Sequence, residues 1–237
     1  MATGEMIQLP KKAQERVEQR SLENSPGNIL SDRMYNLVLG ACVCWGLGVN
    51  VIMCATMSDL AVTIVGKYGL AFIIAYLVLA IAGIVLAHKS KNPLISFIGY
   101  NMVVIPLGIE ISAIVAVYGG MDTMWVQQAF LDTMLITIAM VCLSMLFPQF
   151  FSKIGGILLA CLLGIIVVSI ITMFLGGNSL WLSVVTAVVF SLYIGYDYWV
   201  AQQYAKTLDN AVDSAIDLYM DIALLFLQLV RIFGNSK

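Results

Sequence analysis

The sequence predicts an all-α membrane protein, a bundle of seven transmembrane helices, and three observations support this prediction. Hydrophobic residues make up 61% of the 237 residues and charged residues only 11%, whereas a soluble domain carries about 25% charged residues. The apolar residues form runs of about 20 or more, the length at which a helix crosses a hydrocarbon core about 30 Å thick. The runs lack the alternation of barrel strands, and only helices or closed barrels satisfy their backbone hydrogen bonds in lipid.

A polar arm precedes the apolar runs. Residues 1–33 mix Lys and Arg with Glu, a composition that fits neither a secretory signal nor an acid-poor transit peptide. We therefore expect an N-terminal arm followed by an uncleaved first span. Residues 34–237 are expected to form one transmembrane domain, because the connections between the runs are short. The expected spans are 34–57, 68–87, 94–118, 125–147, 154–175, 180–204 and 211–233.

The basic residues predict the orientation of the chain. Nine of the 12 Lys and Arg residues fall in the arm and in the second, fourth and sixth loops, all on the side of the N-terminus. The N-terminus is therefore expected in the cytoplasm and the C-terminus outside, with the chain in the plasma or inner membrane of the cell. Aromatic residues near the span ends, among them Tyr35 and Trp199, are expected to form interfacial belts.

Composition argues against several classes of function. The net charge of -2 supplies no basic patch of the kind that nucleic acid needs. The five cysteines lack the C-x-x-C spacing typical of metal or redox sites, and the single histidine, His88, cannot build a usual zinc site. We expect no nucleic-acid partner and no cofactor, and we expect the lipid bilayer to be the main environment of the chain.

Acidic residues inside the apolar runs are the informative feature of this sequence. They are Glu110, Asp132, Asp197, Asp217 and Asp221. A charged residue at the centre of a span costs about 3 kcal/mol on insertion scales, so such residues face the bundle interior and often mark ion or proton pathways. For each acid taken alone, a buried and protonated structural role is the alternative.

Depth along the helices predicts that two of these acids meet. Asp197 lies seven residues before the end of the sixth span and Asp221 ten residues into the seventh, which places them about 10 and 15 Å from the same face. Two carboxyl groups in a dry site cannot both ionise cheaply, so the pair is expected to share a proton. Losing that proton would create repulsion and leave a transient cation site between Asp197 and Asp221.

Two further acidic patterns accompany the pair. Asp209, Asp213, Asp217 and Asp221 recur every four residues and form a stripe on one helix face. We expect Asp213 and Asp217 to line a vestibule, although capping of the helix start is the alternative for Asp209 and Asp213. Glu110 and Asp132 lie at similar depths near the opposite face and are expected to form a second acidic layer, beside a bend at Pro106.

The C-terminal stretch also resembles a known family. Residues Val189 to Gly234, VFSLYIGYDYWVAQQYAKTLDNAVDSAIDLYMDIALLFLQLVRIFG, contain a Tyr196-Asp197 pair, a 24-residue step to Asp221 in an LYMD setting, and a closing LFLQLVRIFG. This stretch resembles the C-terminal signature of the Bax-inhibitor family, the transmembrane Bax inhibitor motif proteins, which has bacterial members. The resemblance implies seven spans with the last helix near the bundle centre, and a pH-sensitive calcium leak in which Asp197 and Asp221 are the proton-sensing, gating dyad.

One feature of the family is altered here. Related bacterial members carry an acid in the second span and an Arg at its cytoplasmic end, which latches to the dyad. In this chain the second span has no acid and ends at His88-Lys89. Lys89 is the possible latch, but a lysine lacks the bidentate fork of an arginine.

Two other functions compete with the proton-gated calcium channel. The family includes bacterial proteins that associate with a membrane-bound protease and slow its action, so a regulatory protease-binding protein is the alternative. An intramembrane aspartyl protease also uses two Asp residues on adjacent helices, but its G-x-G-D and P-A-L motifs are missing. We therefore predict that the protein is not an enzyme and that its partners are Ca²⁺, H⁺ and, in the alternative, a membrane protease.

Overall fold

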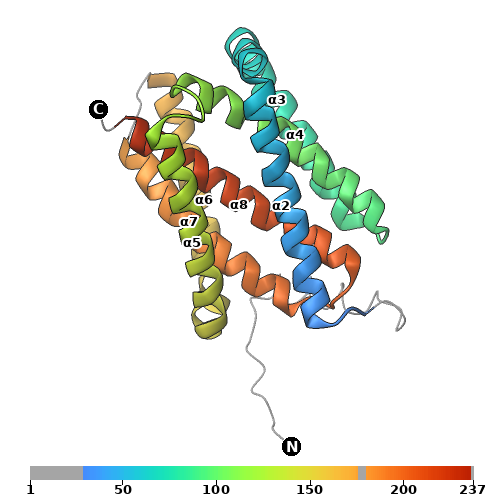
Figure 1. The fold of residues 1–237 in the computed structure, drawn as a ribbon. Helices are drawn as coiled ribbons and strands as arrows, with labels where there is room; N and C mark the ends of the chain where they lie inside the picture. Colours follow the sequence, from blue (N-terminus) through green and yellow to red (C-terminus); the bar gives the residue numbers. More distant parts are fainter. Residues whose placement is uncertain (1–28, 176–179, 236–237) are drawn as a thin grey trace, which may run out of the picture.

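A computed structural model describes residues 29–175 and 180–235. Within these residues the chain forms helices joined by irregular connections, and no strands. The predicted all-α class is confirmed, and Figure 1 shows the bundle. The helices are α2 (Asp32–Thr56), α3 (Ser58–Lys89), α4 (Pro93–Val117), α5 (Met124–Leu146), α6 (Pro148–Leu175), α7 (Leu180–Gln203) and α8 (Leu208–Gly234). Residues 1–28 of the expected N-terminal arm lie outside the described residues.

The helix bounds agree with the expected spans within three residues, except at the starts of the second and fifth spans. The fifth span was expected from residue 154, whereas α6 begins at Pro148. The second span was expected at 68–87, whereas α3 begins at Ser58 and includes Lys67. The helix changes direction at Gly69, whose backbone has φ 27° and ψ -101°. Glycine adopts a positive φ without the penalty of a Cβ. The apolar residues before Gly69 therefore continue the helix beyond the kink and do not form a loop.

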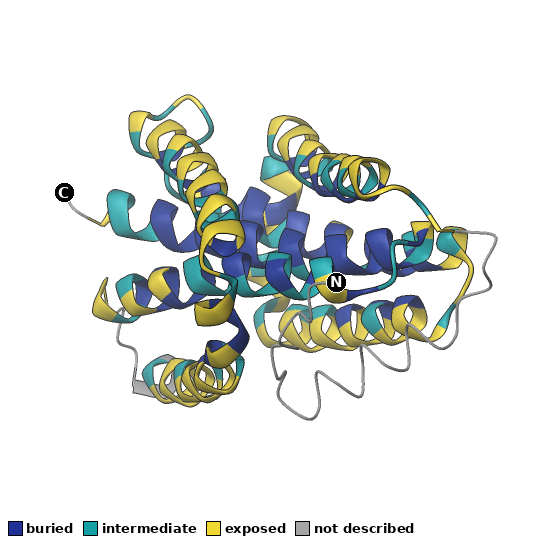
Figure 2. Ribbon diagram, turned by 90° about the horizontal axis from the view of Figure 1, so that it is seen from below, coloured by how far each residue is buried: buried dark blue, intermediate teal, exposed yellow. Residues whose placement is uncertain are grey.

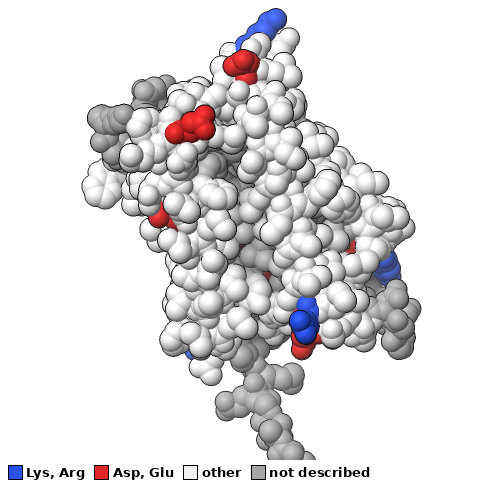
Figure 3. Space-filling model, in the orientation of Figure 1, with Lys and Arg blue, Asp and Glu red and all other residues white. Residues whose placement is uncertain are grey.

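The seven helices are consistent with a multi-pass membrane protein. Six of them, α2 to α7, are long and apolar enough to cross a membrane, and α8 carries four Asp residues. Exposed Leu, Ile and Val side chains cover the outward faces of α3, α5 and α6. In Figure 3, white residues cover most of the middle of the visible face, with only small patches of Asp and Glu atoms, and Lys and Arg lie towards the ends of the helices. Such a large apolar surface suits contact with lipid.

The polar helix α8 lies at the centre of the bundle. It packs against α2, α4, α5 and α7, and 17 of its residues are buried. Figure 2 shows this central helix as mostly buried, whereas the surrounding helices are exposed on their outer faces. An acid-bearing helix is kept away from hydrocarbon by this arrangement. The expectation that the last helix lies near the centre is thus confirmed.

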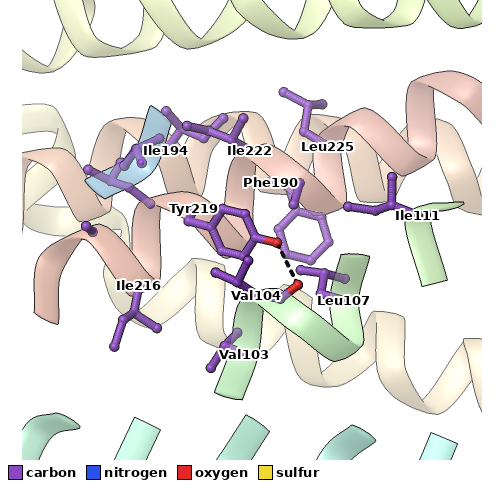
Figure 4. Packing of buried hydrophobic residues seen from close by; sticks show 14 of the residues in the cluster. Val103, Val104, Leu107, Ile111, Phe190, Ile194, Ile216, Tyr219, Ile222 and Leu225 are labelled. Atoms are coloured by element: carbon purple, nitrogen blue, oxygen red, sulfur yellow. Dashed lines mark hydrogen bonds between the residues drawn. The ribbon is translucent and has the colours of Figure 1, made fainter. Parts of the chain in front are cut away.

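The core around α8 is built from large side chains. Tyr219 is completely buried, and its ring packs edge-on against Tyr100 with the ring centroids 5.5 Å apart. Its hydroxyl accepts a hydrogen bond from Asn50 at 2.7 Å and donates to the carbonyl oxygen of Val104 at 3.5 Å. Figure 4 shows Tyr219 among Val104, Leu107 and other apolar residues of the cluster. These contacts fix α8 against α2 and α4.

Candidate functional site

The carboxyl groups of Asp197 and Asp221 lie in contact. Asp197 is on α7 and Asp221 is on α8, two antiparallel neighbours joined by the short segment 204–207. Their side chains lie close enough to interact directly with each other. A carboxylate only accepts hydrogen bonds, so a hydrogen bond between the two groups can form only while the pair holds at least one proton. The structure therefore brings together the two residues that depth along the helices predicts to meet.

The pair lies in a largely dry environment. Asp221 is only 6% exposed and Asp197 is half-buried. The Oδ2 atom of Asp221 has no hydrogen-bond partner in the described part of the chain. Tyr193, one turn before Asp197 on α7, is close enough to interact electrostatically with both carboxyl groups. Because the local dielectric constant is low, adding or removing one proton strongly changes the electrostatic energy between the two carboxyl groups.

The rest of the acidic stripe on α8 is held by protein. Asp209 accepts a 2.7 Å hydrogen bond from the hydroxyl of Ser96 at the start of α4. Asp213 is only 1% exposed, so in this structure it lies within packed protein and not on the wall of an open vestibule. Asp217 is half-buried and interacts electrostatically with Asp221 one turn later. The roles of Asp213 and Asp217 as vestibule residues stay predictions.

The acids near the other end of the bundle lie in separate surroundings. Glu110 on α4 pairs with Arg231 on α8, with the charged atoms 3.7 Å apart. Asp132 on α5 instead accepts a 2.9 Å hydrogen bond from Gln128 of its own helix. The acidic layer expected from Glu110 and Asp132 stays a prediction, and the structure adds a cation from α8 beside Glu110. Counting residues gave the depth of Glu110 but not the direction of the long Arg231 side chain.

Lys89, the possible latch, is exposed in the last turn of α3. Asp221, to which it would latch, is buried. The role of Lys89 therefore stays a prediction.

A group of contacts ties α7 to α8 at the end nearest the pair, and sequence reasoning missed it. The hydroxyl of Tyr35 on α2 donates to the carbonyl oxygen of Ala201 at 3.0 Å and lies 3.1 Å from the hydroxyl of Ser214. The Lys206 Nζ lies 4.4 Å from the centre of the Tyr35 ring and donates to the carbonyl oxygen of Gln202 at 2.9 Å. Burial lowers the pKa of Lys206, and the negative charge of Asp32 opposes this effect.

Two aromatic residues that were expected in interfacial belts are instead core residues. Tyr35 is 0% exposed and Trp199 is 3% exposed. Tyrosine and tryptophan combine an apolar body with a polar group, so a position near a span end fits both an interface and a core. In this chain Tyr35 satisfies its hydroxyl inside the protein, at the junction of α7 and α8.

Comparison with known proteins identifies the family. The model of the family described as "Inhibitor of apoptosis-promoting Bax1" matches residues 28–237. The chain belongs to the Bax inhibitor family. This match covers every described helix, so the Asp197 and Asp221 pair lies within the family's membrane domain.

Curated relatives share only part of this chain. An uncharacterized membrane protein of Streptococcus pyogenes serotype M3 is 29% identical over 137 residues, which are 54% of this chain and 58% of the relative. An uncharacterized protein of Helicobacter pylori strain 26695 is 33% identical over 86 residues, 35% of this chain and 36% of the relative. The matched part thus spans little more than half the length of the streptococcal member. These relatives support a Bax inhibitor family membrane protein and name no activity.

Proposed function

We propose that this protein is a proton-gated cation leak of the membrane, with Ca²⁺ as the permeant ion and Asp197 and Asp221 as the gate. The direct contact of two carboxyl groups from neighbouring helices, one of them buried, is the observation that supports this proposal. While the pair holds a proton, a hydrogen bond between the two groups can join α7 to α8. When the proton leaves, two negative charges repel each other in a poorly solvated site. The helices then separate, and the carboxylates can bind a passing cation.

The proposed ion passes through and does not reside at the pair. Calcium prefers six to eight oxygen ligands. Among the described residues, no group of three or more His, Cys, Asp and Glu side chains could hold a metal ion. Two carboxylates supplemented by water offer a weak site, which suits conduction because a permeant ion must also leave. The proposal includes no enzymatic activity and no cofactor.

We also propose an orientation with the N-terminus in the cytoplasm, in a cell membrane. The excess of Lys and Arg on the N-terminal side supports this. The alternative role as a regulator of a membrane protease depends on the arm, whose residues 1–28 are outside the described part of the chain, and it stays a prediction.

Calcium flux into liposomes across a pH series tests the gate. The wild-type flux should rise with pH, because deprotonation opens the pair. In the Asp221→Asn variant, the amide can donate a hydrogen bond to Asp197 at every pH, so the flux should stay low and lose its pH dependence. Asp122→Asn, at an exposed position between α4 and α5, is the matched control and should respond like the wild type. An Asp221→Asn variant with a normal pH response contradicts the proposal.

A further inference from the structure

A cavity of about 450 Å³ lies between α2, α4, α5 and α8. Its volume is in the range of sites for small organic molecules. Helix α2 packs on α4 and α8, and α5 packs on α7 and α8, so α8 forms the back wall between α2 and α5. Figure 1 shows α2 and α5 on either side of α8, and the face in Figure 3 is hollowed between them. None of the acids discussed above belongs to the lining.

The cavity opens sideways, to the surface that faces lipid. Val51 on α2 and Phe130, Leu131 and Met134 on α5 line it, and these side chains are 45–54% exposed. They belong to helices that are long and apolar enough to cross a membrane. The medium at this opening is therefore hydrocarbon, and an acyl chain can enter the cavity without leaving the bilayer.

The inside of the cavity offers little to a polar ligand or an ion. Its two buried polar side chains each donate a hydrogen bond to protein, Asn50 to the hydroxyl of Tyr219 and Thr133 to the carbonyl oxygen of Ala129. The Oδ1 atom of Asn50 is buried against Gly108 and has no hydrogen-bond partner in the described part of the chain, so it is one buried acceptor in an otherwise apolar wall. The remaining lining is almost entirely apolar. A hydrocarbon chain matches these walls.

The length of the cavity suits one leaflet. The lining extends from Val126 to Met134 on α5, a rise of about 12 Å, and half of a hydrocarbon core is about 15 Å. Met121, in the connection before α5, and the exposed Gln127 lie at one end. This end is near the helix termini, where a lipid headgroup lies.

We propose that this cavity binds an acyl chain of a membrane phospholipid, inserted from the end of the bundle that carries the α4–α5 connection. Ile222 and Ala223, which follow Asp221 directly on α8, form part of the lining. The bound chain therefore packs against the turn of α8 that carries Asp221, one member of the carboxyl pair. This site is separate from the proposed cation path and does not depend on it.

Native mass spectrometry tests the site. The full chain is reconstituted in dioleoyl phosphatidylglycerol vesicles and extracted in mild detergent, and the phospholipid retained per protein is counted. We expect the wild type to retain one phospholipid. Val51→Trp and Leu131→Trp fill the opening from opposite walls, and each should lower the occupancy about tenfold. Two variants are used so that the test survives if one of them does not fold.

Ile52→Trp is the matched control. Ile52 neighbours Val51 on α2 and is 63% exposed, but it does not line the cavity. This variant should retain phospholipid like the wild type. The proposal is overturned if the wild type retains none, if both folded cavity variants retain it fully, or if Ile52→Trp loses as much as they do. The last outcome would mean that the retained lipid only coats the protein surface.

Discussion

The hydroxyl of Tyr35 is a single group that joins three helices. It connects α2 to the carbonyl oxygen of Ala201 at the end of α7 and to the hydroxyl of Ser214 in the second turn of α8. Both helices carry a member of the carboxyl pair. A buried hydrogen-bonding group that loses its partner costs about 1–3 kcal/mol, so this one hydroxyl makes a measurable contribution to the free energy of unfolding.

The Tyr35→Phe variant keeps the ring beneath Lys206 and removes only the hydroxyl. We expect it to lower the free energy of unfolding by about 1–3 kcal/mol, because Ser214 and a carbonyl oxygen lose a buried partner. Thermal unfolding of the purified protein in detergent measures the effect. Tyr68→Phe is the control, since Tyr68 is 54% exposed, and it should leave the unfolding temperature unchanged. Equal unfolding temperatures for the two variants would contradict the role of the Tyr35 hydroxyl.

At the residue scale, sequence reasoning succeeded where the answer depended on depth alone. Asp197 and Asp221 could be brought together by counting residues, because adjacent antiparallel helices with a short loop have a fixed register. The pairing of Glu110 with Arg231 could not, because it depends on helix rotation and on a flexible side chain. The burial of Tyr35 was also missed, since a tyrosine near a span end fits an interface equally well.

At the scale of elements, the contact between α3 and α4 depends on the absence of two side chains. Gly83 and Gly99 face each other, and a Cβ added at either one would overlap the carbonyl oxygen of the other. Small residues at such positions let two helix backbones approach closely in a membrane. Much of α3 is exposed, so this close approach is important for holding α3 on the bundle.

Gly99→Ala tests the α3–α4 contact. The added methyl group meets backbone atoms of Gly83 and Ala87, so we expect destabilisation by about 1–3 kcal/mol from overpacking. Gly40→Ala on α2 is the control, because no atom lies within 4 Å of its added Cβ. Alanine favours a helix by up to about 1 kcal/mol over glycine, so the control should be neutral or slightly stabilised. Thermal unfolding compares the two, and a Gly99→Ala variant as stable as the control would refute the close contact.

Element boundaries followed from hydropathy for five of the seven described helices. The exceptions, α3 and α6, begin ten and six residues before their expected starts, because hydropathy marks where a chain can cross lipid and not where its helix begins. The expected spans left residues 58–67 as a loop, whereas the backbone changes direction at Gly69 and remains helical on both sides. A kink of this kind needs one residue that tolerates positive φ, and a glycine in the sequence does not reveal which conformation it adopts.

At the scale of the whole molecule, the bundle is organised around its most polar helix. Hydropathy alone ranks α8 as the poorest span, since it carries Asp209, Asp213, Asp217 and Asp221. The same acids explain its central place, because each would be costly against hydrocarbon. Composition could therefore predict that α8 is enclosed by protein. Which helices enclose it was beyond the sequence, because the six apolar helices α2 to α7 can be arranged around α8 in many ways.

The Glu110 and Arg231 pair is the charged link between α8 and the surrounding helices at the far end from Tyr35. The two side chains are 27% and 32% exposed, so the pair is neither fully buried nor a surface pair. Removing one partner of a buried pair costs about 3–5 kcal/mol, and an exposed pair contributes at most about 1 kcal/mol. We therefore expect Glu110→Gln and Arg231→Gln each to destabilise the protein by about 1–3 kcal/mol.

The exchanged variant, Glu110→Arg combined with Arg231→Glu, separates pairing from the individual residues. If the link between α4 and α8 is electrostatic, reversing both charges restores the attraction, and the double variant should regain most of the lost stability. Thermal unfolding of the wild type, the two single charge reversals Glu110→Arg and Arg231→Glu, and the exchanged variant in the same detergent gives the coupling energy. A deficit in the exchanged variant equal to the sum of the two single deficits would mean that each side chain acts through its own packing, and that no ion pair holds α8 at this end.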